Sequence, residues 1–161
     1  MSPPACREDS FNGPLEVRRP VRILTSAVCD HAVRTPDGKL DLHGIFHDLY
    51  SPGFPARQDR MTLVLTLEWD RRDEGRHTFR IDVRDPGGRP TLTVEGESEV
   101  TPTPPGRPPP RTPLVMQLED VVFPVPGQYE FEVSAKGQAM SGPTLFLVEL
   151  EGEDPPGGDP R

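Results

Sequence analysis

Four residues near the start of the chain have side chains that could do chemistry: Cys29, His31, His43 and His47. A thiolate with two or three imidazoles is a plausible zinc set, and a cysteine beside a histidine has the residue types of a thiol nucleophile. The spacing matches no strong zinc pattern, and Cys29 ends an apolar run, where a cysteine usually behaves as a small hydrophobe. We therefore expect no metal and no other cofactor, and keep a metal-dependent or thiol enzyme centred on these four residues as an alternative.

Other catalytic motifs are missing from the sequence. No serine lies in a G-x-S-x-G elbow, and the adjacent glycines of "DPGGRP" lie in a predicted hairpin turn rather than before a helix, so they do not form a phosphate loop. Glu95, Glu97 and Glu99 alternate along one segment. They are expected to form a solvated strand face that pairs with Arg80 and Arg84. The sequence favours a protein that is not an enzyme and has no catalytic residue.

The elements that position these residues are predicted to be β-strands, because apolar residues recur with a period of two. "MTLVLTLEW", "RHTFRIDVRD" and "GQYEFEVSAKG" each place apolar side chains on one face and polar ones on the other. Turn signals recur mostly every 8–13 residues. The predicted fold is an all-β, antiparallel β-sandwich of immunoglobulin-like type with about eight strands and little or no helix. The predicted strands are 21–33, 39–49, 61–69, 76–84, 90–100, 114–123, 128–135 and 143–150.

The prolines divide the chain into an ordered part and its tails. We predict a flexible, proline-rich tail over residues 1–20, a sandwich domain over 21–150 and an acidic, disordered tail over 151–161. Residues 101–113 contain seven prolines and are predicted to be a stiff crossover between the two sheets. The P-x-x-P spacings within 102–113 leave a recognition motif open as an alternative.

Charge and cysteine content limit the function classes and the compartment. The net charge of −8 disfavours nucleic-acid binding. No secretory signal and no run of about 18 apolar residues is present, so we expect a cytoplasmic protein without membrane contact. The two cysteines, Cys6 and Cys29, do not form a disulfide scaffold. The abundance of Arg, Pro, Gly and Ala suggests a bacterial source, and the oligomeric state is left open.

One predicted loop has the composition of a binding surface. Residues 50–60, "YSPGFPARQDR", contain Tyr50, Phe54, Arg57 and Arg60, and aromatic and arginine residues are enriched in protein interfaces. The leading prediction is a non-enzymatic binding or accessory module that contacts another protein through this loop or through a sheet edge. Two alternatives stay open: Phe54 covers the end of the sandwich, or the open sheet face binds a carbohydrate or another small ligand.

The segments "CDHAVRTPDGKLDLHGIF", "FPARQDRMTLVLTLEW", "HTFRIDVRDPGGRP" and "VFPVPGQYEFEV" together suggest a family. They resemble a group of small uncharacterised bacterial proteins, known only as a domain of unknown function, over about residues 22–150. The resemblance implies a cytosolic immunoglobulin-like sandwich that begins with a hairpin, and Asp30, Gly38, Lys39 and Gly44 match its pattern. It implies no substrate, cofactor or catalytic residue. We expect Gly44 to mark a bulge or a close approach at which the second strand changes the side that faces inward.

Overall fold

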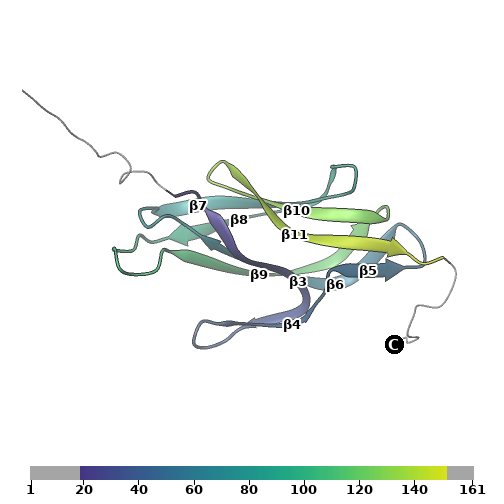
Figure 1. Cartoon of the computed structure of the whole chain (residues 1–161), viewed down its shortest axis with the longest axis horizontal. Coiled ribbons are helices and arrows are strands. Elements are labelled where there is room, and N and C mark those ends of the chain that lie inside the picture. Colours follow the sequence, from purple (N-terminus) through teal and green to yellow (C-terminus); the bar gives the residue numbers. More distant parts are fainter. Residues whose placement is uncertain (1–18, 152–161) are drawn as a thin grey trace, which may run out of the picture.

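The computed structural model describes residues 19–151 and folds them into nine β-strands, with no helix in that range. The strands form two sheets that face each other across one apolar core (Figure 1). The predicted all-β class is therefore confirmed, whereas the immunoglobulin-like topology stays a prediction. Residues 1–18 of the predicted N-terminal tail, which include Cys6, and residues 152–161 of the predicted C-terminal tail lie outside the described residues.

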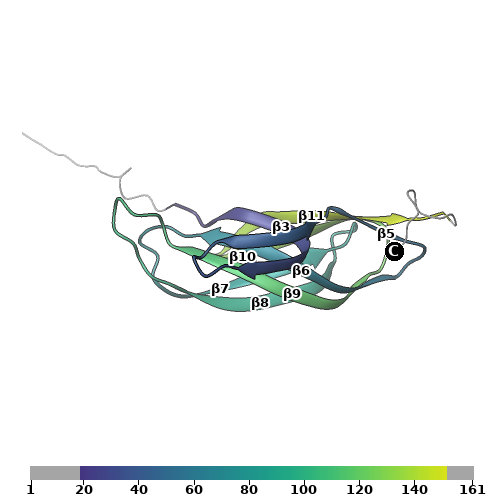
Figure 2. The same ribbon diagram turned by 90° about the horizontal axis from the view of Figure 1, so that it is seen from below.

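The strands of both sheets run along the long axis of the domain (Figure 2). The five-stranded sheet has the order β5 (Asp48–Ser51), β11 (Gln138–Glu149), β10 (Gly127–Ala135), β7 (Gly75–Arg84) and β8 (Pro90–Val100). The four-stranded sheet has the order β4 (Leu40–Ile45), β3 (Arg22–Arg34), β6 (Ala56–Glu68) and β9 (Arg111–Phe123). Residues 101–110 connect β8 of one sheet to β9 of the other. The described residues contain no helix that could cross a membrane.

The predicted second strand, 39–49, is in fact two strands that belong to different sheets. Its first part, β4, pairs antiparallel with β3, and its last part, β5, pairs parallel with β11. Between them the N–H of Phe46 donates to the carbonyl of Val28 at 3.0 Å, and the Phe46 side chain packs against the core. Anchoring Phe46 draws the chain across from one sheet to the other. The strand count is therefore nine rather than eight, and one pairing is parallel.

Three other strands begin three to five residues earlier than predicted: β6 at Ala56, β9 at Arg111 and β11 at Gln138. Two of them contain a proline near the predicted start. Proline is tolerated in edge strands and at bulges; β9 is an edge strand, and Pro143 lies where the register between β10 and β11 shifts. The first residues of β6 are polar, so the apolar alternation that marks a strand is missing there.

Alternate residues of the strands form the core, as the sequence predicts. The buried side chains include Met61, Leu63, Leu65, Leu67 and Trp69; Phe79, Ile81 and Val83; and Tyr129, Phe131 and Val133. The rings of Phe123 and Tyr129 meet edge to face, with centroids 5.0 Å apart and planes at 84°. Since β9 and β10 belong to different sheets, this ring pair joins the two layers.

Tyr129 also fixes the turn between β9 and β10. Its hydroxyl donates to the carbonyl of Val125 at 2.7 Å and accepts the N–H of Val125 at 3.1 Å. Burial raises the pKa of Tyr129, which keeps the hydroxyl protonated and able to donate. The hydroxyl of this fully buried tyrosine therefore has a hydrogen-bond donor and an acceptor, and these bonds hold the turn against the core.

Gly44 shapes the hairpin of β3 and β4, which projects below the two layers in Figure 1. Its φ of +71° lies in the left-handed region, and a Cβ added there would overlap the carboxylate of Asp30. Only glycine takes this conformation without steric cost. The close approach predicted at Gly44 is confirmed.

Gly44→Ala is expected to lower the free energy of unfolding by about 1–2 kcal/mol, because alanine would be strained at this φ. Gly53→Ala is the control, since that residue has no neighbour within 4 Å and no positive φ; it should leave stability unchanged or raise it. Urea denaturation of both variants measures the difference. Equal stabilities would contradict the strain argument.

Candidate functional site

The four residues considered for metal binding or thiol chemistry lie in one region but do not form a site. His31 and His43 are cross-strand neighbours on β3 and β4, with ring centroids 6.0 Å apart. Cys29 is fully buried, and its thiol donates to the carbonyl of His31 at 3.5 Å. His47 lies in the connection between β4 and β5, where its carbonyl accepts the N–H of Phe146. Residues 19–151 contain no group of three or more His, Cys, Asp or Glu placed to hold a metal ion.

The chemistry of Cys29 follows from its burial. Burial raises the pKa of the thiol, and the nearby charge of Asp30 raises it further, outweighing backbone hydrogen bonds that lower it. Nucleophilic attack and metal ligation both require the thiolate. The arrangement therefore gives the metal-dependent or thiol enzyme no support.

The four residues of the predicted binding loop do not form one loop. Tyr50 lies on β5, whereas Arg57 and Arg60 lie on β6 of the other sheet, so only residues 52–55 connect two strands. Tyr50 is 59% exposed, and Phe54 is partly buried against the core, as the alternative interpretation expected. Arg57 forms an ion pair with Asp120 at 3.1 Å. The prediction of a loop over 50–60 is wrong because its two ends join different sheets.

The hairpin of β3 and β4 extends beyond the rest of its sheet. β6 pairs with β3 only from Arg22 to Cys29, and β4 pairs with β3 from Cys29 to Arg34. The second half of β3 therefore has β4 as its only neighbour, and β4 is the last strand of the sheet. The other edge of β4 pairs with no strand of the described residues. A two-stranded ribbon of this kind is only marginally stable in water, and a third strand stabilises it.

The other sheet edges carry features that prevent strand pairing. Glu95, Glu97 and Glu99 place charge along β8, Pro113 removes a donor from β9, and β5 has only four residues. Natural sheets protect their edges with charges, prolines and short strands. β4 has no proline and no lysine between Leu40 and Ile45. It is therefore the least protected edge in the described part of the chain.

The outer face of the four-stranded sheet is uncharged across its middle. The registers place Ala27 beside Val64 and Val115, and Cys29 beside Thr62. We call this surface the neutral face; it consists of Thr25, Ala27, Cys29, Thr62, Val64, Thr66, Pro113, Val115 and Gln117. Five of the eight exposed large hydrophobic residues in the described range lie on this sheet: Leu24, Val33, Ile45, Val115 and Val122. Cys29, Thr62, Val64 and Thr66 are themselves buried, so the exposed apolar area belongs to residues around them.

The outer face of the five-stranded sheet differs over β7, β8 and β10, where charged pairs cover it, whereas Phe146 of β11 and Tyr50 of β5 are exposed apolar side chains. Arg80 of β7 lies 3.9 Å from Glu95, which confirms one predicted cross-strand pair. Arg84 pairs with Glu132 of β10 at 3.0 Å instead of with the glutamates of β8. Such pairs on exposed strands contribute little stability individually but leave few unpaired charges for a ligand.

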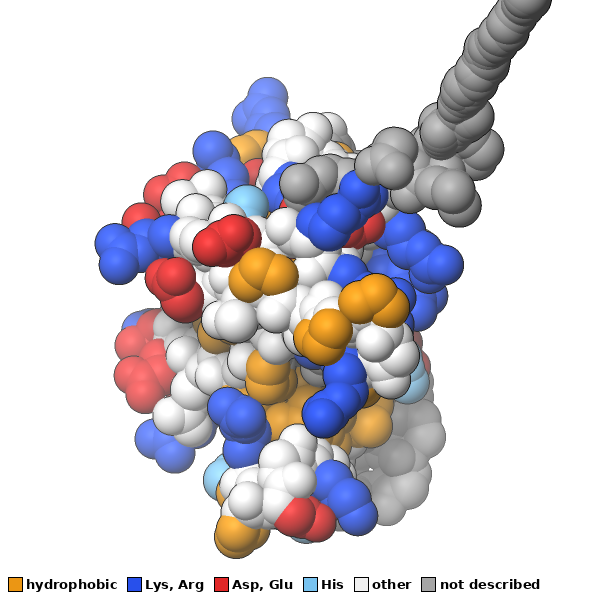
Figure 3. All heavy atoms as spheres, turned by 90° about the vertical axis from the view of Figure 1, so that its left-hand side faces the viewer, with side chains coloured by type: hydrophobic (Ala, Val, Ile, Leu, Met, Phe, Trp, Pro, Cys, Tyr) orange, Lys and Arg blue, Asp and Glu red, His pale blue; other side chains and the backbone are white. Residues whose placement is uncertain are grey.

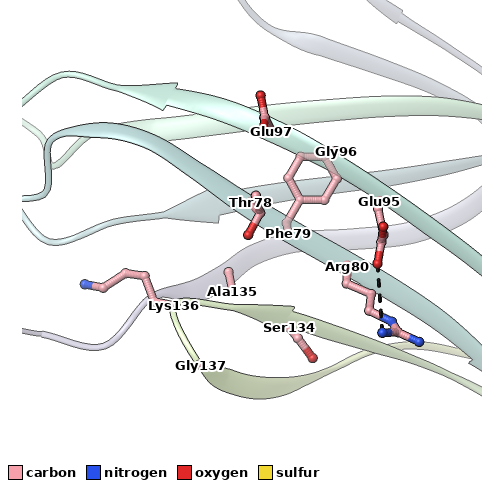
Figure 4. Close-up of a pocket in the computed structure, with 10 residues that line it drawn as sticks. All are labelled: Thr78, Phe79, Arg80, Glu95, Gly96, Glu97, Ser134, Ala135, Lys136 and Gly137. Carbon is pink, nitrogen blue, oxygen red and sulfur yellow. Dashed lines mark ion pairs between the residues drawn. The ribbon is translucent and has the colours of Figure 1, made fainter.

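A hollow of about 470 Å³ lies over β7, β8 and β10 on this charged side (Figure 4). The ring of Phe79 lies across Gly96, where a Cβ would come within 2.6 Å of it. Arg80 is paired with Glu95, and Lys136 contacts Asp73 at 2.8 Å. The residues that line the hollow include no histidine or cysteine. Its charges are already paired, so it does not form a distinct site.

Sequence reasoning missed the neutral face and the open edge of β4. Apolar alternation in "MTLVLTLEW" indicated which residues face the core, and the small residues between them were assigned to solvent. Only the strand order shows that Thr62 and Val64 lie between Cys29 on one side and Val115 on the other. A run of uncharged residues on the outward side of β6 was the signal that could have revealed this face.

In the native protein, Cys29 is expected to react with iodoacetamide about tenfold or more slowly than in the unfolded chain, because it is buried and its pKa is raised. Mass spectrometry of the Cys29 peptide, with and without guanidinium, measures the ratio. Fast labelling of the native protein would show that the thiol is accessible and would restore the nucleophile hypothesis.

Asp82 on β7 is expected to make stability depend on pH. Thr93 donates to its carboxylate at 2.6 Å; this bond and the nearby Arg80 and Arg84 lower the pKa of Asp82 despite its burial. Because the folded pKa lies below the unfolded one, the stabilisation is present above about pH 4 and is lost as the pH falls below it. Asp82→Asn should therefore cost about 1–3 kcal/mol at pH 7 and progressively less in acid.

Urea denaturation of wild type and Asp82→Asn at pH 7, pH 4 and pH 2.5 measures this difference. Asp41→Asn, an exposed change on the hairpin, controls for the substitution itself. A difference that stays constant down to pH 2.5 would contradict the role of the ionised carboxylate.

Comparison with known proteins gives a family but no activity. No curated protein is a significant match to the chain. Among solved structures, it is similar to the Pseudomonas fluorescens alkylpurine DNA glycosylase AlkC bound to DNA containing an abasic site analog, with 12% identity and a TM-score of 0.39, over 76% of this chain and 30% of that chain. This likeness is too distant to support an argument. The model of DUF6941, a family of unknown function, matches residues 24–147, so the chain belongs to that family.

Proposed function

We propose that this protein is a non-enzymatic protein-binding or accessory module, and that its partner adds an extended strand to the open edge of β4. The observation that carries this proposal is the projecting hairpin: among the described residues no strand pairs with the outer edge of β4, which contains no proline or lysine and only one acidic residue, Asp41. An added strand would satisfy the unpaired N–H and C=O groups of β4 and complete a three-stranded ribbon. A bacterial source and a cytoplasmic location belong to the same proposal.

Side chains beside this edge would provide the specificity of strand addition. Val33 and Ile45 on the hairpin are 43% and 53% exposed, and the stacked rings of His31 and His43 lie between them. Ile45 is the register partner of Cys29, so the neutral face begins directly beside it. A partner strand on β4 can therefore extend its contacts over uncharged surface, whereas β7, β8 and β10 of the opposite sheet would present paired charges.

The immunoglobulin-like topology is part of this proposal. Two facing sheets and a tyrosine at the start of a strand, whose hydroxyl bonds back to the preceding turn, are features of immunoglobulin-like sandwiches. Tyr129 makes that contact with Val125. A sandwich of this kind serves as a rigid support for edges and loops, and binding modules commonly present their contacts in this way.

Photocrosslinking in the source cells tests the proposal. A benzoylphenylalanine placed at Asp41 on β4 is expected to give one dominant protein adduct, and the same group at Glu97 on the opposite sheet is not. Ile45→Lys should abolish the Asp41 adduct, because a lysine beside an edge disfavours strand pairing. Ile45 is largely exposed, so this variant should keep its thermal stability.

Three results would contradict strand addition at β4: no adduct from position 41, the same adduct from position 97, or an adduct that persists in Ile45→Lys. The thermal unfolding of each labelled protein serves as the folding control.

A further inference from the structure

A second hollow lies at the end of the sandwich where β6 leads into β7 and β8 into β9. Its volume is about 630 Å³, within the range of small-molecule sites, about 300–1,000 Å³. Four arginines line it, namely Arg19, Arg22, Arg71 and Arg72, against two carboxylates, Glu68 and Asp70. Figure 3 views this end of the molecule, where blue side chains lie around orange ones. We call this hollow the arginine pocket.

Both carboxylates of the arginine pocket are already engaged. Glu68 accepts from Arg22 at 2.7 Å and from Arg111 at 3.0 Å, so two guanidinium groups share one negative charge. Asp70 pairs with Arg72 at 3.3 Å. Burial opposes ionisation of Asp70, but hydrogen bonds from Arg19 and Arg72 outweigh it and lower its pKa to about 2. Asp70 and Arg72 neutralise each other, whereas Arg22 and Arg111 carry one positive charge more than Glu68 neutralises.

Two of the four lining arginines have no carboxylate partner among the described residues. Within residues 19–151, no Asp or Glu lies at ion-pair distance from Arg19 or Arg71. Arg71 is held in place, because its Nε and Nη2 donate to the carbonyl of Arg107 at 3.1 and 2.5 Å. A guanidinium fixed in this way loses little conformational freedom when it binds an anion. The pocket is therefore strongly positive in a chain whose net charge is −8.

Thr103 belongs to the wall of the arginine pocket. Its Oγ1 is the one buried side-chain polar atom in the described residues that has no hydrogen-bond partner. Thr103 lines the arginine pocket, and its N–H donates to the carbonyl of Arg71 at 3.0 Å. A buried hydroxyl without a partner destabilises the folded protein. Because this oxygen is shielded from solvent, Thr103 shapes the wall of the pocket and contacts the Arg71 backbone through its N–H.

The remaining wall of the arginine pocket is apolar and rigid. Pro20, Pro105 and Pro109 line it together with Trp69, whose Nε1 donates to Thr112 at 2.9 Å. Proline rings and a fixed indole lose no freedom on contact with a ligand. They suit the carbon skeleton of an organic molecule, while the arginines suit its charged groups.

We propose that the arginine pocket binds a small organic anion that carries at least two phosphate or carboxylate charges. Guanidinium groups pair with both kinds of oxyanion in bidentate geometry. The proposal does not depend on strand addition at β4, since that edge belongs to another part of the molecule. It adds a ligand site to the binding module.

Isothermal titration of the full chain with pyrophosphate, adenosine diphosphate and citrate at pH 7 and low salt tests the proposal. We expect at least one of them to bind with a Kd below about 1 mM. Preference for the two phosphate compounds identifies phosphate as the recognised group, and preference for citrate identifies carboxylate. Arg71→Gln should weaken binding about tenfold or more, and Arg89→Gln, in the distant turn between β7 and β8, should not.

A further variant separates binding from folding. Arg19→Gln changes an exposed side chain that lines the pocket and should weaken binding without altering Tm. The proposal is overturned if none of the three anions binds below about 1 mM, or if Arg71→Gln and Arg89→Gln bind equally.

Discussion

A strand residue can face only two sides, and this constraint determines every surface of the domain. Because Leu63 and Leu65 of β6 are buried against the opposite sheet, Thr62, Val64 and Thr66 must face outward. The same alternation on β7 and β8 puts arginines and glutamates outside. The middle of one outer face is thus uncharged, whereas charged pairs cover β7, β8 and β10 on the other.

The two sheets also have edges and ends, and these differ in how the backbone N–H and C=O groups find hydrogen-bond partners. Charge, proline and short length protect β8, β9 and β5, whereas β4 projects with a single acidic residue, Asp41, and no proline or lysine. At the end of the sandwich the strands are joined by loops, and in one of them the backbone carbonyl of Arg107 accepts a hydrogen bond that fixes the side chain of Arg71. The edge suits an extended peptide, and the loops suit a compact anion.

The sequence predicts those features that depend on neighbours along the chain. Alternation predicted the buried residues of β6, β7 and β10, and the positive φ of Gly44 agrees with its place in the hairpin pattern. Alternation cannot say which sheet a strand joins, so the division of 39–49 was missed. The arginine pocket could not be predicted, because Arg19, Arg71 and Thr103 come from separate segments that only tertiary packing brings together.

The short strand β5 has a mechanical consequence. It continues directly from the hairpin and pairs in parallel with β11, so the segment from β3 to β5 is fastened to both layers. Tension applied along β5 from the hairpin would shear four residue pairs against β11 together, instead of opening them one after another. A protein attached to β4 could therefore pull on the hairpin while both layers share the force.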